Sequence, residues 1–362
     1  LELIFTSGGS EANTLALKGL FETNLLRKSN RQRYLVGSLE HPSLKKAAES
    51  LQSKGAEILW IPVLRSGAVD LESYANMLSD STALVSMMLA NNETGNIFPI
   101  GKMAKMAHEV GALFHTDAVQ ALGKIEIDLP RLHVDLASFA GHKFYALKGS
   151  GFLFTRKGLN LEPLICGGGQ ERHRRGGTEN VLAIASLGEM CKRKAEVLER
   201  GQKMQMLRDQ LECYLKKTIP GLSITGAESP RLPSTSSMLI PGIDGEILLM
   251  NLDMRGYSVS TGAACSSGSP EPSPVLLGMG LTRYEAQSSL RVGIGWSTTE
   301  KQLVQFAQTL QEVVKHLRKL NQYEGELESE ESLKFDWNCA TSCEESERHA
   351  RQSLSSGSEE LQ

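Results

Sequence analysis

The sequence predicts an α/β fold, in which a mostly parallel central sheet is covered by helices, followed by a smaller α+β domain. Two observations predict it. Over the first 160 residues, short apolar runs of strand length alternate with longer segments whose apolar residues recur every three or four positions. After about residue 180 this alternation gives way to a long helical stretch and shorter, mixed elements. Strand–helix alternation is typical of parallel sheets, whose ligands collect at the carboxyl ends of the strands.

In the first domain, expected at residues 1–200, the strands are short apolar runs and the helices carry apolar residues on one face. The strands are expected at residues 34–38, 58–63, 83–90, 112–115, 134–139 and 151–155. The helices are expected at residues 11–27, 41–54, 71–79 and 101–110.

The second domain, expected at residues 201–323, mixes helices and strands. A long helix rich in Glu, Lys, Arg, Met and Leu leads into it at residues 181–217. The further elements are a strand at 236–240, a helix at 245–254, a Gly/Ser/Pro-rich loop at 261–274, a strand at 290–294 and a closing helix at 299–320. Residues 324–362 form an acidic, Ser-rich tail with few apolar residues, which we expect to be disordered.

Composition excludes several classes of protein. The 362 residues are 40% hydrophobic and 22% charged, so the chain can bury a large core and is neither disordered throughout nor a coiled coil. Its 39 basic and 42 acidic residues nearly balance and form no long basic run, so nucleic acid is not an expected partner. No apolar stretch is long enough to span a membrane, and the N-terminus lacks the features of a signal peptide. We therefore expect a cytoplasmic protein.

The six cysteines are too sparse for a disulfide framework, which favours a reducing compartment. Cys166, Cys191 and Cys213 are expected to be structural. Cys339 and Cys343 form a CxxxC pair in the tail, but a metal site needs more ligands than they supply, and we assign them no role.

The segment FAGHKFYALKGSGFLF is the most informative short piece of the sequence. His142 and Lys143 follow directly on an apolar run and precede a glycine-flanked loop. Such a lysine can form a Schiff base with a carbonyl once desolvation or a neighbouring cation activates its amine. Taken alone, the segment favours a surface lysine in a turn over a Schiff-base lysine.

Three further segments agree with a Schiff-base lysine, although each has a simpler explanation by itself. In TSGGSEAN, Gly9 and Ser10 begin a helix, where backbone N–H groups favour an anion such as phosphate. In FHTDAVQ, Asp117 and Gln120 follow a strand; a carboxylate there could keep a pyridine nitrogen protonated, or cap a helix. In SLEHPS, His41 could stack on a cofactor ring, move protons, or be structural.

Together these segments resemble the cysteine desulfurases of the NifS/IscS type, which are class V aminotransferase-family enzymes with the fold type I architecture and pyridoxal 5′-phosphate (PLP) as cofactor. The resemblance extends from Leu1 to about Leu320. Eight motifs occur in the order of the family: TSGGSEAN, LEHPS, ANNETG, HTDAVQALGK, GHKFY, GGGQERHRRGGTEN, GAACSSGSPEPSPVL and SLRVGIGWSTT.

The resemblance implies a role for each matching position that faces the cofactor ring. Lys143 would carry PLP as a Schiff base and act as the base. Asp117 would pair with the ring nitrogen and Gln120 with the ring hydroxyl. His41 would stack on the ring as a further catalytic residue, and Asn92 would lie near both ring and substrate.

The resemblance also implies phosphate and substrate ligands. Gly9, Ser10 and His142 would bind the phosphate, and Thr178 would reach the phosphate of a neighbouring subunit, which implies a homodimer. Arg291 would clamp the substrate carboxylate, a task suited to a bidentate guanidinium.

The implied reaction converts L-cysteine into L-alanine and leaves a persulfide on Cys265. Small residues around Cys265 would let the thiol visit the active site and then present its sulfur to an acceptor, expected to be a NifU/IscU-like scaffold for iron–sulfur clusters. The one metal role considered is a transient iron–sulfur ligand at Cys265.

Two departures from the family motivate alternative functions. Ala140 replaces the serine that usually precedes GHK, which favours a selenocysteine lyase as the alternative. The sequence also lacks the N-terminal arm of the family, with its LDNNATT-like strand and GNPSS-like segment. We expect a fragment, a misplaced start, or a truncated and catalytically impaired dimer that acts as a binding protein.

Overall fold

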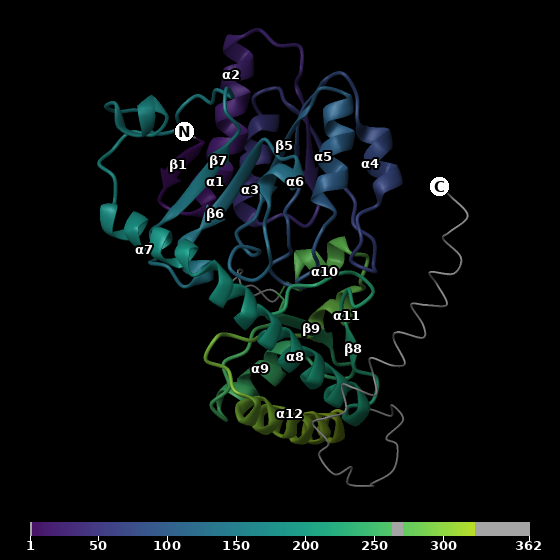
Figure 1. The fold of residues 1–362 in the computed structure, drawn as a ribbon. Coiled ribbons are helices and arrows are strands. Elements are labelled where there is room, and N and C mark those ends of the chain that lie inside the picture. Colours follow the sequence, from purple (N-terminus) through teal and green to yellow (C-terminus); the bar gives the residue numbers. More distant parts are fainter. Residues whose placement is uncertain (1, 263–270, 323–362) are drawn as a thin grey trace, which may run out of the picture. The chain divides into compact units, whose positions relative to one another are not determined.

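The computed structural model describes residues 2–262 and 271–322. The chain divides into two compact units, each labelled by its elements in Figure 1. Unit 1 consists of Leu1–Gly201, Gly226–Leu232 and Pro274–Leu281, and unit 2 consists of Gln202–Thr225, Pro233–Ser273 and Thr282–Gln362. Two short segments from the second half of the chain therefore belong to unit 1. The acidic tail, Cys265, Cys339 and Cys343 lie outside the described residues.

Unit 1 is built on a seven-stranded sheet with the order β1-β7-β6-β5-β4-β2-β3. Strands β2 to β6 run parallel to their neighbours in that set, and β7 runs antiparallel to both β6 and β1. The central strands are buried along almost their whole length, as expected for a parallel sheet covered on both faces. The strands are β1 (Leu3–Thr6), β2 (Arg33–Gly37), β3 (Glu57–Ile61), β4 (Thr82–Ser86), β5 (Leu113–Asp117), β6 (Leu136–Ala140) and β7 (Gly151–Thr155).

Helices connect these strands, as the alternation of the sequence predicts. The helices of unit 1 are α1 (Gly9–Thr14), α2 (Leu20–Leu26), α3 (Pro42–Gln52), α4 (Leu71–Met77), α5 (Ile100–Glu109), α6 (Leu129–Leu132), α7 (Val181–Lys192) and α10 (Pro274–Gly278), the last from the second half of the chain. The helix expected at 11–27 is interrupted by a π-helical segment at Leu15–Gly19, and the helix expected at 181–217 breaks at Arg193 before α8 (Lys194–Thr218).

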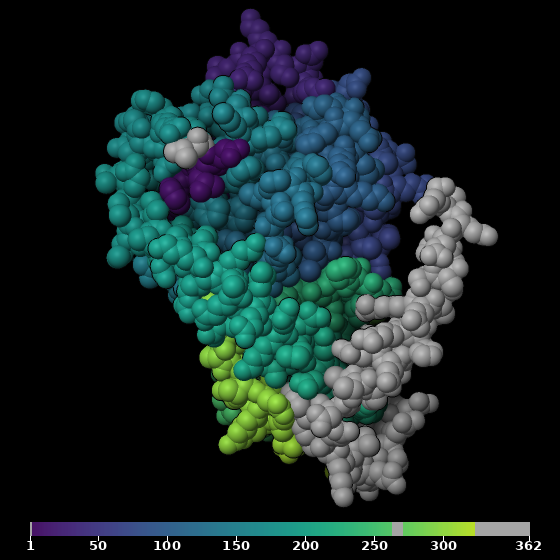
Figure 2. All heavy atoms as spheres, viewed as in Figure 1, coloured from purple at the N-terminus to yellow at the C-terminus, as the bar shows by residue number. Residues whose placement is uncertain are grey.

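The edge strand β1 is covered by a left-handed turn. Figure 2 shows this strand, in dark purple, at the surface of the unit. Three consecutive residues from Glu171 to His173 have φ of 48°, 61° and 64°. The turn lets the Arg174 guanidinium donate to the Leu3 carbonyl (2.7 Å) and the Glu171 carboxylate accept from the Phe5 N–H. These contacts satisfy backbone groups that an open edge would offer to another chain.

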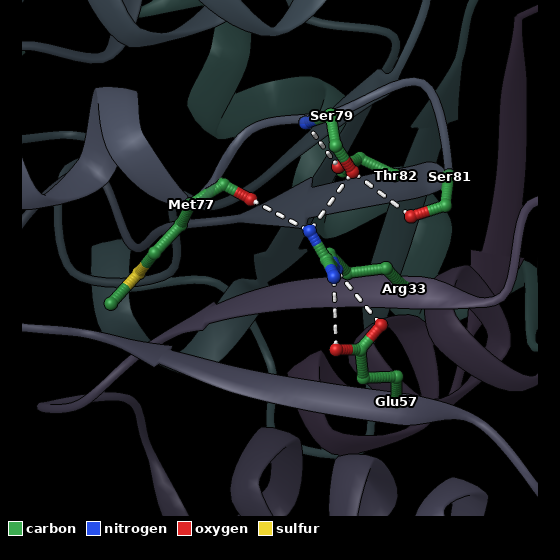
Figure 3. Close-up of polar contacts among 6 residues, drawn as sticks. All are labelled: Arg33, Glu57, Met77, Ser79, Ser81 and Thr82. Atoms are coloured by element: carbon green, nitrogen blue, oxygen red, sulfur yellow. Dashed lines mark hydrogen bonds and ion pairs between the residues drawn. The ribbon is translucent and has the colours of Figure 1, made fainter.

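Arg33, the first residue of β2, ties β2, β3 and the segment before β4 together (Figure 3). Its guanidinium makes a two-point ion pair with Glu57 (Nε–Oε2 2.8 Å, Nη2–Oε1 3.0 Å) and donates to Ser79 Oγ at 2.9 Å. The pair raises the pKa of Arg33 and lowers the pKa of Glu57.

We predict that Arg33→Ala lowers the free energy of unfolding by about 1–2 kcal/mol, because a two-point pair and a further hydrogen bond are lost from a half-exposed site. Urea denaturation measures the change. Arg131→Ala is the matched control, since Arg131 is highly exposed and its distance to Asp128 is 3.5 Å; it should cost less than about 0.5 kcal/mol. Equal losses in the two variants would contradict the prediction.

Unit 2 contains a three-stranded antiparallel sheet with the order β10-β9-β8, covered by helices. A capping box formed by Thr299 and Gln302 begins α12, whose buried residues recur every three or four positions. The elements are most of α8, β8 (Ser223–Ile224), β9 (Thr235–Leu239), α9 (Gly245–Asp253), α11 (Arg283–Gln287), β10 (Ser289–Gly293) and α12 (Glu300–Leu320). No helix in the described part of the chain is both long and apolar enough to cross a membrane.

Candidate functional site

Four predicted site residues follow the carboxyl ends of four neighbouring strands. His41 comes after β2, Asn92 after β4, Asp117 ends β5, and Lys143 comes after β6. Burial lowers the pKa of His41; the Asp117 carboxylate opposes this effect and the Lys143 ammonium adds to it. The structure therefore brings His41, Asp117 and Lys143 close enough to interact.

Asp117 is a buried carboxylate at the end of β5, two residues beyond the strand end that the sequence indicated. Its Oδ2 accepts a hydrogen bond from Asn13 Nδ2 (2.7 Å) and its Oδ1 accepts one from the Val119 N–H (2.9 Å). Burial raises its pKa although these two donors and His41 oppose the rise. The residues after it form turns rather than an α-helix, so Asp117 is not a helix cap.

His41 is the N-cap of α3. Its Nδ1 accepts from the Ser43 N–H (3.1 Å) and lies 2.8 Å from Ser43 Oγ. An imidazole nitrogen that accepts from an amide carries no proton, so the neutral ring is protonated at Nε2. The cap thus sets both the orientation and the tautomer of His41.

The loops that carry His41 and Asn92 are fastened to each other. The buried Glu40 accepts from the Met88 N–H, and Asn91 Nδ2 donates to the Leu39 carbonyl (3.2 Å). Burial, together with the charge of Asp117, raises the pKa of Glu40 well above its usual value. Asn91 Oδ1 also accepts from two backbone amides of the ANNETG loop. These contacts explain why the apolar run expected as a strand at 83–90 ends as a strand at Ser86 and continues as a buried loop.

Lys143 and His142 lie in a 3-10 turn, Gly141–Phe144, directly after β6. Gly141 is required there, because a Cβ would lie 2.3 Å from Ser150 Oγ. Both side chains are exposed in the single chain. The sequence suggested that either desolvation or a neighbouring cation could activate the Lys143 amine. Because the side chain is exposed, the described residues do not desolvate it.

Gly9 begins α1 in a tight space next to the site. A Cβ at Gly9 would lie 2.7 Å from Val119 Cγ2 and 3.4 Å from Ala140 Cβ. The absence of a side chain lets the first turn of the helix approach the end of β6 and the loop after β5. Its backbone amides, with Ser10 exposed beside them, form the positive end of a helix that favours an anion.

Gln120 and Thr178 contact residues other than His41, Asp117 and Lys143. Gln120 Oε1 accepts from Lys124 Nζ (2.9 Å), which leaves its amide nitrogen as the donor. Thr178 is exposed and lines a pocket of about 240 Å³ with Ser7, Arg175 and Asn180. Arg175 pairs with Glu11 of α1 (Nε–Oε1 2.9 Å), which joins the GGTEN segment to the start of that helix.

Arg291 lies on β10 in unit 2, where its backbone pairs with that of Ser260. The described residues next to 263–270 contact this unit. Ser260 and Gly262 bind β10 before that segment, and Glu271 pairs with Arg283 (2.9 Å) after it. Cys265 itself lies outside the described residues.

The cysteines and potential metal ligands in the described residues give no second site. Cys213 is buried, but Cys166 and Cys191 are exposed, so burial does not support the structural role that we expected for those two. Among the described residues, His, Cys, Asp and Glu side chains form no group of three that could hold a metal ion.

Sequence reasoning missed Asn13, Glu40 and Asn91, whose side chains hold the predicted site residues. All three lie within or next to quoted motifs, which was the only signal available. Glu40 contacts Met88, which is 48 residues away along the chain, and Asn13 contacts Asp117, which is 104 residues away. No local sequence pattern could reveal these contacts.

The described residues fit PLP. The backbone amides at Gly9 and Ser10 begin α1 and favour a phosphate, and each Asp117 oxygen accepts one hydrogen bond and can accept another. A primary amine, Lys143, lies within interaction range of that carboxylate's partner His41. A phosphate, a basic ring nitrogen and a carbonyl are the groups that this set of residues would hold.

His115 lies two residues before Asp117 on β5 and is fully buried. Ser86 Oγ lies 2.8 Å from its Nδ1 and Ser138 Oγ 2.8 Å from its Nε2, so the ring joins β4, β5 and β6. Burial lowers its pKa to about 3.

We predict an acid-sensitive stability from His115. The folded protein keeps the ring neutral, whereas the unfolded chain binds a proton near its usual pKa of about 6.5, so stability is lost as pH falls below that value. Between pH 7 and pH 5 the loss should be about 2 kcal/mol. Urea denaturation at both pH values tests it against His115→Gln, which cannot take up the proton. The same pH dependence in both proteins would rule the effect out.

Comparisons with known proteins agree with this geometry. Residues 1–306 match the family described as Aminotransferase class-V. The chain is 38% identical over 323 residues to the cysteine desulfurase NifS of Azotobacter vinelandii, covering 89% of this chain and 79% of that protein. It is 39% identical over 323 residues to the cysteine desulfurase IscS of Clostridium botulinum strain Hall, covering 88% and 81%. A solved NifS-like protein superimposes with a TM-score of 0.79 at 34% identity, covering 87% and 83%. The predicted fold class is confirmed.

Proposed function

Because the chain belongs to the aminotransferase class-V family, and within it to the NifS- and IscS-type cysteine desulfurases, we propose that it converts L-cysteine into L-alanine with PLP as cofactor and leaves a persulfide on Cys265. One observation carries the proposal from the structure. Lys143, Asp117 and His41 converge at the carboxyl ends of adjacent parallel strands, beside the helix start at Gly9.

When bound, PLP supplies an electron sink that lets bonds at the substrate's α-carbon and β-carbon break heterolytically. The Lys143 amine binds the cofactor carbonyl and takes the α-proton of the substrate. The Asp117 carboxylate holds a proton on the ring nitrogen. Backbone amides at Gly9 and Ser10, with His142, bind the phosphate, and Gln120 donates to the ring hydroxyl.

His41, Asn92 and Arg291 position the substrate in this proposal. His41, protonated at Nε2, presents a ring face and a donor to the site, and Asn92 supplies an amide from the fastened ANNETG loop. Arg291 binds the substrate carboxylate with a two-point guanidinium contact. Thr178 contributes to the phosphate site of a second subunit.

Sulfur transfer is assigned to Cys265. Its thiolate attacks the sulfur of the substrate, the S–S bond forms, and the C–S bond breaks. The electron pair of that bond stays with the substrate carbon, which takes a proton and becomes the methyl group of alanine. The persulfide sulfur then passes to an acceptor, for which a NifU/IscU-like scaffold is the proposed class.

A homodimer is part of the proposal. Large apolar side chains are exposed on both sides of Thr178, a distribution that favours burial against a second copy. They are Leu164, Ile165, Val181 and Leu182. Light scattering of the purified chain measures the oligomeric state, and a monomer would contradict the role of Thr178.

The test measures alanine and sulfide released from L-cysteine by the purified chain with PLP and a thiol reductant. Equal amounts of both are expected, and Cys265→Ala should lose them.

The buried Ala140 at the end of β6 favours a selenocysteine lyase as second candidate. The lyase would be established if the wild-type protein turned over little cysteine and the Cys265→Ala variant still released alanine from selenocysteine. If the purified chain did not bind PLP, the remaining candidate would be a catalytically impaired dimer that acts as a binding protein.

A further inference from the structure

Asn13, one turn into the first helical segment, connects two residues of the site that are far apart in the sequence. It is 1% exposed, and its Nδ2 carries two hydrogens. Nδ2 donates to Asp117 Oδ2 on β5 (2.7 Å) and to Ser43 Oγ on α3 (3.2 Å). One amide group therefore touches the elements that carry Asp117 and His41.

The second branch continues from Ser43 to His41. Because Ser43 Oγ accepts from Asn13, its own hydrogen is available for His41 Nδ1, 2.8 Å away. The Ser43 N–H donates to the same nitrogen at 3.1 Å. Two donors at Nδ1 place the ring proton at Nε2, so the chain of donors runs from Asn13 through Ser43 to His41.

The orientation of Asn13 is set by Asp117 rather than by its own packing. Its Oδ1 is buried and has no partner among the described residues, which is unfavourable for an amide oxygen. The flipped amide would place that oxygen against the carboxylate oxygen of Asp117. A charge-assisted hydrogen bond to Asp117 outweighs the unsatisfied acceptor.

We propose that Asn13 is a positioning residue, which holds the Asp117 carboxylate for the ring nitrogen of PLP and, through Ser43, fixes His41 with its proton on Nε2. The inference rests on the proposed function for the identity of the cofactor. The network itself is a property of the protein chain and can be measured without turnover.

The test uses two readouts on the full chain. The first is the 15N resonance of His41 Nδ1 in histidine-labelled protein, assigned with His41→Asn. The second is the dissociation constant of PLP, measured by absorbance titration. Asn13→Ala should move the Nδ1 resonance toward that of a nitrogen without hydrogen bonds and should weaken PLP binding at least about tenfold. Ser43→Ala should move the resonance but change PLP binding less than about twofold.

Asn24→Ala is the matched control, since Asn24 lies on α2 and its Nδ2 is 3.5 Å from the Tyr34 hydroxyl. It should change neither readout. If Asn13→Ala does not fold, Asn13→Leu, which has a similar size and no group that could donate to Asp117, should weaken PLP binding to a similar extent. An unchanged resonance and an unchanged dissociation constant in either Asn13 variant would overturn the inference. A wild-type chain that binds no PLP would instead refute the proposed function, while the resonance would still decide the network.

Discussion

Replacing Lys143 with alanine is expected to lower the rate of alanine formation from L-cysteine by at least about 10³-fold, because the proposed mechanism gives this amine two tasks. It binds the cofactor carbonyl and accepts the α-proton of the substrate. No other described lysine follows directly on the carboxyl end of β6, where the 3-10 turn presents the amine within range of His41. The measurement is alanine release at saturating PLP and cysteine, with circular dichroism to verify folding.

Lys148→Ala provides the control for Lys143. Lys148 lies in the same exposed loop and, like Lys143, lowers the pKa of His142 by its charge. Its removal changes the local charge to the same extent but leaves the proposed nucleophile in place, so activity should stay within about threefold of wild type. A Lys143→Ala variant that keeps more than a tenth of wild-type activity would show that another group performs the proton transfer.

The arrangement of the sheet could be predicted because burial on both faces produces apolar runs of strand length, which β2 and β4 to β7 retain. The interruptions could not be predicted. The π-helical segment at Leu15–Gly19 and the break at Arg193 both lie within continuous helical patterns. The left-handed turn at Glu171–His173 contains no glycine, so only its contacts with the edge strand explain it.

For the site residues too, one part could be predicted from the sequence and another could not. The positions of His41, Asp117 and Lys143 after strands are visible in the sequence, and a parallel sheet brings such positions to one edge. Their surroundings are not visible, because they depend on partners in other elements. The raised pKa of Asp117 follows from burial, which outweighs the opposing hydrogen bond from Asn13, and the tautomer of His41 follows from its role as a helix cap. The exposure of the Lys143 side chain likewise depends on whether a cofactor or a second subunit covers it, which the sequence pattern does not show.

Asp117→Asn is expected to lower kcat for alanine formation by roughly 10²- to 10³-fold, the usual effect of removing one preorganised electrostatic group from a buried site. The substitution keeps the size of the side chain and removes its charge. Val119 N–H and Asn13 Nδ2 would then meet a neutral amide, and the cofactor ring nitrogen would lose the counter-charge that holds its proton. Because the helix start at Gly9 is unchanged, PLP should still bind, so the loss should appear in kcat at saturating cofactor.

Asp80→Asn is the control for this prediction, since Asp80 is exposed and lies before β4, at the opposite end of the strands from the site. Its activity should equal that of the wild type. The comparison also separates the electrostatic role of Asp117 from a structural one: a structural role would lower the unfolding midpoint in urea together with activity, whereas the electrostatic role lowers kcat in a variant of near-native stability. If Asp117→Asn kept kcat within about threefold, the buried carboxylate would not be the group that controls the ring nitrogen, and the proposed mechanism would need a different partner there.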